Sequence, residues 1–248
     1  MSALDHRRVR FLDEMGIAPV WILRDASPAV AAQQVQQVPQ EHTSARSTQT
    51  ADTVAAMDWT QLEASVSGCT LCGLCQGRSN TVFGVGDRKA RWLFVGEGPG
   101  RNEDQQGEPF VGNAGKLLDN MLLAMGLQRG NDVFIANVVK CRPTDGNGRD
   151  RPPTAEESAA CMPYLERQIA LIQPTVIVAL GKTAALALLE ADAETPVAQL
   201  RGKVHQRNGV PLVVTYHPSY LLRTPGDKAK AWQDLCLAMT THAASHAD

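Results

Sequence analysis

The sequence predicts an α/β protein with a three-layer α/β/α architecture, in which helices cover both faces of a central, mainly parallel four-stranded sheet. Two observations predict this fold class. Short apolar runs alternate with longer segments whose apolar residues recur every three or four positions, the patterns of buried strands and amphipathic helices. The short runs contain almost no polar residue, as in strands that are covered on both faces.

Four strands are expected, and each is a run of apolar residues rich in valine, isoleucine or phenylalanine. They span residues 91–95, 133–137, 175–179 and 212–215. The pair Asn208-Gly209 before the fourth strand favours a tight hairpin turn, because both residue types tolerate a left-handed backbone.

Helical periodicity fills the intervals between the strands. Helices are expected from Asn113, from Thr154, over 182–190 and over 227–242. The second helix opens with a capping box of Thr154 and Glu157. It also contains Pro163, which predicts a bend.

The last expected helix carries large apolar side chains on one stripe. Trp232, Leu235 and Met239 recur at helical spacing, and Cys236 lies beside them. We therefore expect all four residues in the core.

The chain divides into three segments by composition. Residues 1–25 form a short amphipathic segment, and residues 26–56 are rich in Ala, Gln, Ser and Thr with no periodicity. The second stretch is expected to be a disordered linker. The first is either a docking peptide for a partner protein or chain that packs loosely on the domain. The α/β domain is expected over 57–248.

Composition and charge limit the class of protein. Of the 248 residues, 44% are hydrophobic and 20% charged, and the net charge is −2. A fibre, a collagen and a wholly disordered chain are excluded. No run approaches the ~20 apolar residues of a membrane span, and the charged N-terminus does not resemble a signal peptide. We expect a cytoplasmic monomer with no membrane partner, whose contacts with nucleic acid come from local basic loops.

Cysteines are the first unusual feature of the sequence. Cys69, Cys72 and Cys75 fall within seven residues, and Cys141 and Cys161 follow at longer intervals. In a reducing compartment such crowding indicates a metal or a cluster rather than disulfides. Two pairs, 69/72 and 141/161, supply four thiolates, and their spacing leaves zinc and an iron-sulfur cluster open.

The least ordinary residues lie where the expected strands end, the edge at which parallel sheets bind ligands. They are residues 96–100 (GEGPG), Asn137, residues 181–183 (GKT) and residues 217–218 (HP). The first run lacks dinucleotide-site spacing because Arg101 stands where a glycine or another small residue would be needed. Residues 181–183 resemble the end of a P-loop, but the glycine that a P-loop needs five residues before Gly181 is replaced by Val176. We therefore expect an ordinary helix N-terminus there.

Basic residues gather in the loops that are expected at this same edge. They are Arg142, Arg149, Arg151, Arg201, Lys203, Arg207, Arg223, Lys228 and Lys230. Together they predict a local phosphate-binding rim on a chain that is nearly neutral overall.

Five motifs in a fixed order resemble the family 4 uracil-DNA glycosylases, the iron-sulfur branch of that superfamily. The motifs are residues 96–100 (GEGPG), 102–104 (NED), 107–112 (GEPFVG), 137–143 (NVVKCRP) and 217–223 (HPSYLLR). The resemblance covers about residues 60–243. It implies a DNA-repair hydrolase that removes uracil from single- or double-stranded DNA and leaves an abasic site.

The resemblance also implies a 4Fe-4S cluster. Its ligands would be Cys69, Cys72, Cys141 and Cys161, whereas Cys75 matches no ligand position of the family. Because glycosidic hydrolysis transfers no electrons, such a cluster resembles a structural staple.

By the same resemblance, a flipped uracil would be held by three residues. Phe110 matches the stacking aromatic, and Asn137 matches the amide that donates to O4 and accepts from N3–H. Glu103 would lie near the C5 edge, where it would exclude the methyl group of thymine.

The resemblance assigns the chemistry to His217 and Glu97, with Asn137 as a third catalytic residue. His217 would donate a hydrogen bond to uracil O2 and stabilise the departing anion. Glu97 would position water or stabilise the sugar cation. Gly98, also expected at the substrate, stands where better-known uracil glycosylases carry an aspartate, so a dedicated aspartate base is absent.

The motif after the histidine resembles a loop that inserts into DNA. Ser219 and Arg223 would contact the backbone, and Leu221 or Leu222 would fill the vacated stack. Core packing is the alternative for both leucines.

Two other functions remain open from the sequence. The missing aspartate is compatible with a catalytically weak iron-sulfur protein that binds or senses DNA lesions. The strand-end glycines and Lys182 are compatible with an iron-sulfur or zinc protein that acts on small nucleotides.

Overall fold

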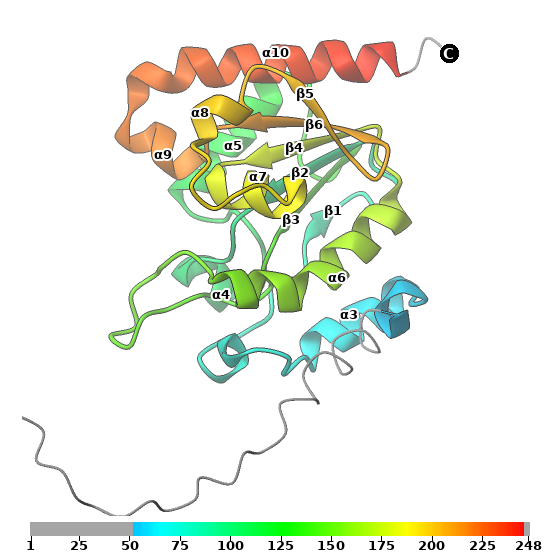
Figure 1. Ribbon diagram of the computed structural model, residues 1–248, viewed down its shortest axis with the longest axis vertical. Helices are drawn as coiled ribbons and strands as arrows, with labels where there is room; N and C mark the ends of the chain where they lie inside the picture. Colours follow the sequence, from blue (N-terminus) through cyan, green and yellow to red (C-terminus); the bar gives the residue numbers. More distant parts are fainter. Residues whose placement is uncertain (1–51, 246–248) are drawn as a thin grey trace, which may run out of the picture. The chain divides into compact units, whose positions relative to one another are not determined.

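A computed structural model of the chain describes residues 52–245 (Figure 1). The predicted segment 1–25 and most of the predicted linker 26–56 lie outside the described residues. Residues 52–55 are helical and Val54 is buried, so the described fold starts slightly before the expected boundary at residue 57.

The sheet has six strands in the order β1-β3-β2-β4-β6-β5. They are β1 (Val85–Gly86), β2 (Trp92–Gly96), β3 (Val133–Asn137), β4 (Val176–Leu180), β5 (Val204–Arg207) and β6 (Val210–Thr215). The four central strands are parallel to one another and correspond to the four predicted strands. The edge strands β1 and β5 pair antiparallel. They are additional to the four predicted strands, although the hairpin turn expected at Asn208-Gly209 already implied a strand in the place of β5.

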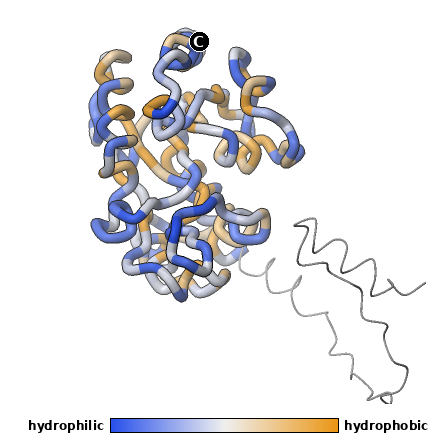
Figure 2. The backbone as a smooth tube through the Cα atoms, turned by 90° about the vertical axis from the view of Figure 1, so that its left-hand side faces the viewer, coloured by the Kyte–Doolittle hydropathy of each residue, from blue (hydrophilic) through white to orange (hydrophobic). Residues whose placement is uncertain are grey.

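Helices cover both faces of the sheet, which confirms the three-layer architecture. They are α3 (Trp59–Ser67), α4 (Arg101–Gln106), α5 (Asn113–Ala124), α6 (Ala155–Ile172), α7 (Lys182–Leu189), α8 (Val197–Leu200), α9 (Pro218–Arg223) and α10 (Lys228–Ala244), with 3-10 turns η1 (Gly73–Gln76) and η2 (Pro225–Asp227). Buried residues of α3, α6 and α7 pack with one face, and those of α5 and α10 with the other. In Figure 2 the hydrophobic segments concentrate in the interior of the domain.

Several local signals act as the sequence predicts. Thr154 Oγ1 accepts from Glu157 N at 3.2 Å, and Glu157 Oε2 accepts from Thr154 N at 2.8 Å, which completes the capping box of α6. Asn208 and Gly209 have φ values of 50° and 82° and join β5 to β6. Among residues 52–245, no helix has both the length and the apolar content that crossing a bilayer requires.

One core prediction on α10 is wrong. The Trp232 side chain is 41% exposed, and Cys236 is only half-buried. The prediction for Leu235 is confirmed, because the helix turns Ala231, Leu235 and Ala238 inward, and Met239 is partly buried against the same core. Trp232 and Cys236 lie beside this inward face and are turned further toward solvent.

Enlarging an inward alanine of α10 should therefore destabilise the domain. Ala238 is fully buried, so Ala238→Leu should lower the free energy of unfolding by about 1–3 kcal/mol through overpacking. Ala243→Leu, on an exposed position of the same helix, should change it by less than about 0.5 kcal/mol. Urea unfolding followed by circular dichroism measures both, and equal losses would contradict this packing of α10.

Candidate active site and cysteine pocket

The order of the central strands marks one place at their carboxyl ends where a crevice is expected, and we call this place the crevice. From β2 the chain moves to β3 on one side, and it then crosses to β4 on the other side of β2. This reversal is a topological switch point, where open α/β sheets bind ligands. The loops that meet there follow β2, β3, β4 and β6, and they carry the motifs that the sequence singled out.

At Gly96 the side chains of Asn137 and Phe110 come close to the backbone of β2. Gly96 pairs with Asn137 in the β2/β3 register. A Cβ at position 96 would lie 2.4 Å from Asn137 Oδ1 and 2.6 Å from Phe110 Cζ, distances that real structures do not contain. Only glycine therefore lets the asparagine and the aromatic ring reach the same place.

Asn137 offers an unused acceptor to the crevice. Its side chain is 2% exposed, and Oδ1 has no hydrogen-bond partner among the described residues. An orphaned buried carbonyl costs about 1–3 kcal/mol, so it marks a place where a ligand's N–H group would pair.

Phe110 adopts a backbone conformation that is rare for a residue with a side chain. Its φ is 56°, in the left-handed region. Arg129 secures this conformation by donating to the carbonyls of Pro109 and Phe110, each at 2.9 Å. Gly115 leaves the necessary room, because a Cβ there would lie 1.7 Å from the Phe110 oxygen. The ring is thereby held against the ring of His217, with centroids 5.5 Å apart.

His217 caps the N-terminus of α9. Its Nδ1 accepts from Ser219 N at 3.1 Å and lies 2.7 Å from Ser219 Oγ. Burial lowers the pKa of His217 to about 4, and the charge of Arg223 acts in the same direction. The imidazole is therefore neutral at physiological pH. With Nδ1 accepting, the ring hydrogen belongs on Nε2, which makes Nε2 a donor.

Glu97 and Gly98 follow β2. Thr183 Oγ1 donates to Glu97 Oε2 at 2.5 Å and so ties the β2 loop to the start of α7. Gly98 packs on a buried side chain, and a Cβ at this position would lie 2.7 Å from Val139 Cγ2. Because valine is β-branched and stiff, this contact leaves no room for an aspartate at position 98.

Glu103 has a local structural partner. Its Oε1 accepts from Val111 N at 3.0 Å and from Gly112 N at 3.2 Å, at the N-terminus of α5. The carboxylate thus fixes the loop that follows Phe110. Its approach to the C5 edge of a base stays a prediction.

The two leucines after His217 differ in exposure. Leu221 is 1% exposed and packs with Tyr216 and Ala231, so it belongs to the core and is not available to insert into DNA. Leu222 is 43% exposed and Arg223 is exposed. Of the two expected wedge residues, only Leu222 can insert in this conformation.

The basic rim is weaker than the sequence predicts. Ion pairs join Arg142 to Asp150, Arg151 to Glu157, Arg201 to Asp234, and Lys230 to Asp227. Arg207 lies at the opposite end of the sheet, because β5 runs antiparallel to β6, and it pairs with Glu166 and Glu190. Local acidic partners therefore neutralise much of the expected positive charge.

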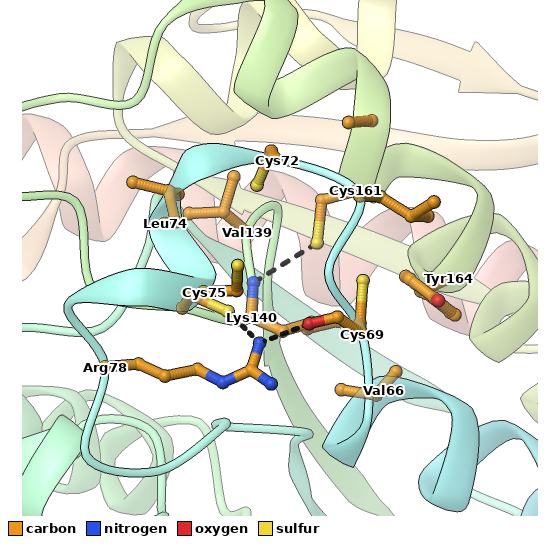
Figure 3. A pocket seen from close by; sticks show the side chains of 13 residues that line it. Val66, Cys69, Cys72, Leu74, Cys75, Arg78, Val139, Lys140, Cys161 and Tyr164 are labelled. Atoms are coloured by element: carbon orange, nitrogen blue, oxygen red, sulfur yellow. Dashed lines mark hydrogen bonds between the residues drawn. The ribbon is translucent and has the colours of Figure 1, made fainter. Parts of the chain in front are cut away.

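A second pocket contains five of the six cysteines. Cys69, Cys72, Cys75, Cys141 and Cys161 line it, and none of them forms a disulfide. They come from the segment after α3, the segment after β3, and α6. In Figure 3 the sulfur atoms of Cys69, Cys72, Cys75 and Cys161 face one another around Lys140.

Nitrogen donors point at two of these sulfur atoms. Arg78 Nη1 lies 3.2 Å from Cys141 Sγ and 2.8 Å from the Cys69 carbonyl, and Lys140 N lies 3.3 Å from Cys161 Sγ (Figure 3). Such N–H groups stabilise negative charge on sulfur. Burial raises the pKa of Cys161 to about 12 and also raises the pKa of Cys72 and Cys141. The free thiols are therefore protonated, and they become thiolates when a metal centre supplies compensating charge.

Lys140 connects the two sites, and sequence reasoning missed it. Its side chain is 1% exposed, and Nζ donates to the Asn137 carbonyl at 2.8 Å and to Gln168 Oε1 at 2.6 Å. Burial lowers the pKa of Lys140 to about 8. The available signal was a lysine directly after an apolar run, between Asn137 and Cys141. Arg129 and Thr183 were also missed, because their partners are distant in sequence.

Comparison with known proteins agrees with this geometry. Residues 83–236 match the family described as the Uracil DNA glycosylase superfamily. This range contains Glu97, Phe110, Asn137, His217 and the second cysteine pair, and it begins after the first pair.

Curated relatives extend the match over most of the chain. A Type-4 uracil-DNA glycosylase of Pyrobaculum aerophilum is 41% identical over 187 residues, which cover 73% of this chain and 93% of the relative. Those of Thermotoga maritima and Archaeoglobus fulgidus are 45% and 48% identical over 166 residues, covering 66% and 64% of this chain and 83% and 81% of the relatives. The resemblance carried by the five sequence motifs is confirmed, and the chain belongs to the uracil-DNA glycosylase superfamily.

Proposed function

We propose that this protein excises uracil from DNA by hydrolysing the N-glycosidic bond, which leaves an abasic site. The observation that carries this proposal is the unpartnered, buried Oδ1 of Asn137, which meets the Phe110 ring at Gly96, while that ring in turn faces the neutral His217. The Type-4 uracil-DNA glycosylases that cover most of the chain support it.

Base recognition follows from the acceptor and the ring. Asn137 Oδ1 accepts from N3–H of uracil, and the amide nitrogen donates to O4. Cytosine carries an acceptor at N3 and a donor at C4, so it would leave this amide and its own groups mispaired at a cost of about 1–3 kcal/mol each. Phe110 supplies the flat surface on which a flipped base stacks, and the hydrogen bonds from Arg129 keep that surface in place.

Bond cleavage places negative charge on uracil and positive charge on the sugar. As the C1′–N1 bond breaks, its electron pair moves to the base, where His217 Nε2–H donates to O2 and stabilises the anion. The Glu97 carboxylate faces the developing sugar cation, which water then captures; the proton that this water loses neutralises the uracil anion. Residue 98 is a glycine, so it supplies no carboxylate to this step, and Val139 occupies the space that a side chain there would need.

The DNA partner is uracil-containing DNA, single- or double-stranded. The target nucleotide must leave the stack to reach a crevice at the strand ends, and Leu222 fills the space that it vacates. Arg223, on the next position of α9, contacts the backbone phosphate together with the Ser219 region.

We further propose that Cys69, Cys72, Cys141 and Cys161 hold a 4Fe-4S cluster. The five-cysteine pocket and the N–H donors directed at sulfur fit such a centre. Among residues 52–245, no three Cys, His, Asp or Glu side chains are grouped closely enough to hold a single metal ion. When bound, the cluster would cross-link the segment after α3 to β3 and α6, and it supplies no step of the hydrolysis.

Removing the Asn137 amide tests base recognition. Asn137→Ala should lower the rate of uracil excision by about tenfold or more, because a transition-state contact worth ~1.4 kcal/mol or more is lost. Single-turnover cleavage of a uracil-containing oligonucleotide, read as alkali-labile sites, measures this rate. Asn147→Ala, on an exposed loop, is the matched control. DNA binding without excision by the wild-type protein would support a lesion sensor instead.

The protonation state of His217 makes a prediction for the pH profile. Its pKa of about 4 lies far below 6.5, so the ring stays neutral from about pH 5.5 to 8 and becomes charged only in more acidic solution. His217→Ala should therefore lower the excision rate by about tenfold or more at every pH in this range. His205→Ala, on edge strand β5, should have no such effect. A loss that appears only below about pH 6.5 would mean that the residue acts as a cation.

The cluster assignment is tested by iron content. Cys161→Ser should lower the iron bound per chain and the visible absorbance of anaerobically purified protein, and it should lower the melting temperature because the staple is lost. Cys236→Ser, on α10 and outside the cysteine pocket, should leave all three unchanged. Unchanged iron in Cys161→Ser would contradict the assignment of this ligand.

A further inference from the structure

One side-chain hydrogen bond connects the loops that follow β2 and β4, the two strands on either side of the switch point. Thr183 Oγ1, in the first turn of α7, donates to Glu97 Oε2, directly after β2, at 2.5 Å. The strands that precede them, β4 and β2, are neighbours in the sheet. We propose that Thr183 is a positioning residue that holds the Glu97 carboxylate in its productive orientation. This inference rests on the proposed uracil excision.

The backbone of Thr183 is well placed for such a role. Ala184, Ala185 and Leu188 are fully buried and anchor α7 on the sheet. Gly181, which caps this helix, has a φ of 93°, and a Cβ there would lie 2.8 Å from His217 Cβ. The loop before Thr183 is thus fitted against the His217 backbone. Thr183 therefore links the carboxylate to the same rigid loop that packs on the histidine.

The Glu97 side chain needs an external restraint. Glutamate has three rotatable side-chain bonds and loses much conformational freedom when it is held in one orientation. Within the part of the chain that the structure describes, the Thr183 hydroxyl donates a hydrogen bond to this carboxylate and so restrains it. A threonine hydroxyl has one hydrogen to donate, and here it goes to Oε2, so the other carboxylate oxygen, Oε1, keeps its acceptor sites. Holding one oxygen in place keeps the negative charge of the carboxylate fixed, which is what stabilising a developing sugar cation requires.

This arrangement explains a motif that the sequence left without a role. Residues 181–183 (GKT) resemble the end of a P-loop but lack its first glycine. The threonine contacts a catalytic carboxylate instead of a metal-bound phosphate. Gly181 provides the close approach to His217, so the motif orders the two reacting groups relative to each other.

A double-mutant cycle tests whether Thr183 acts through Glu97. Thr183→Val keeps the shape of the side chain and removes the hydroxyl, whereas Thr183→Ser keeps the hydroxyl. Under single-turnover conditions, Thr183→Val should lower the maximal excision rate about tenfold and leave the half-saturating DNA concentration unchanged. Thr183→Ser should stay within about twofold of wild type. In the Glu97→Ala background, Thr183→Val should cost less than about twofold more.

Other results would overturn the inference. A Thr183→Val loss of equal size in the wild-type and Glu97→Ala backgrounds would assign Thr183 a merely structural role. If either Thr183→Val or Glu97→Ala excised uracil at the wild-type rate, the contact between the two residues would have no role in excision. The proposed uracil excision itself would still be supported by the activity of the wild-type protein. Thr195→Val, on the loop between α7 and α8, controls for loss of a threonine hydroxyl, and melting temperatures verify that each variant is folded.

Discussion

The absence of a side chain at Gly96 is the steric condition on which the crevice depends. Asn137 Oδ1 and the Phe110 ring both lie where a Cβ of residue 96 would be. The two groups come from different parts of the chain, and only the end of β2 brings them together. Around this point the protein accepts two local costs, a left-handed phenylalanine and an unpaired buried carbonyl. Such costs cluster at functional sites, where a bound ligand offsets them.

The end of β3 joins the crevice to the cysteine pocket. Asn137 closes the strand, Lys140 follows with a buried amine, and Cys141 lies in the pocket three residues after Val138. Lys140 fixes the Asn137 carbonyl from one side and presents its own N–H to Cys161 on the other. The short segment after β3 therefore makes hydrogen bonds at both sites. The proposed cluster and the residue proposed to read the base thus lie on one short stretch of chain.

Sequence patterns predicted the part of the fold that depends on local composition. The central strands were recognisable because every residue of β2, β3 and β4 is buried, which requires continuous apolar runs. Strand β1 has only two residues, and β5 alternates between exposed and half-buried positions, so neither has such a run. Trp232 is exposed because Ala231, Leu235 and Ala238 form the inward face of α10, and alanine gives a weak hydrophobic signal in the sequence.

The site was predictable in so far as it lies at strand ends. Asn137 and His217 follow apolar runs, and parallel topology brings these positions together. The residues that hold them could not be predicted in the same way. Thr183 is 86 positions from Glu97, and Arg129 is 19 from Phe110, so no local pattern links the partners. The predicted basic rim was too strong for a related reason. Asp150 and Asp234 are brought against Arg142 and Arg201 by the folding of the chain, and they neutralise these charges.

The packing of Gly98 on Val139 also constrains how this crevice can evolve. A carboxylate at position 98 would add a second acidic group beside Glu97, yet its Cβ meets Val139 Cγ2 at 2.7 Å. Val139 is itself fully buried, so it cannot turn aside into solvent. A lineage that gained the aspartate first would pass through a clashing intermediate, whereas one that first replaced Val139 with a smaller residue would not. Sterics therefore favour a change at position 139 before one at position 98.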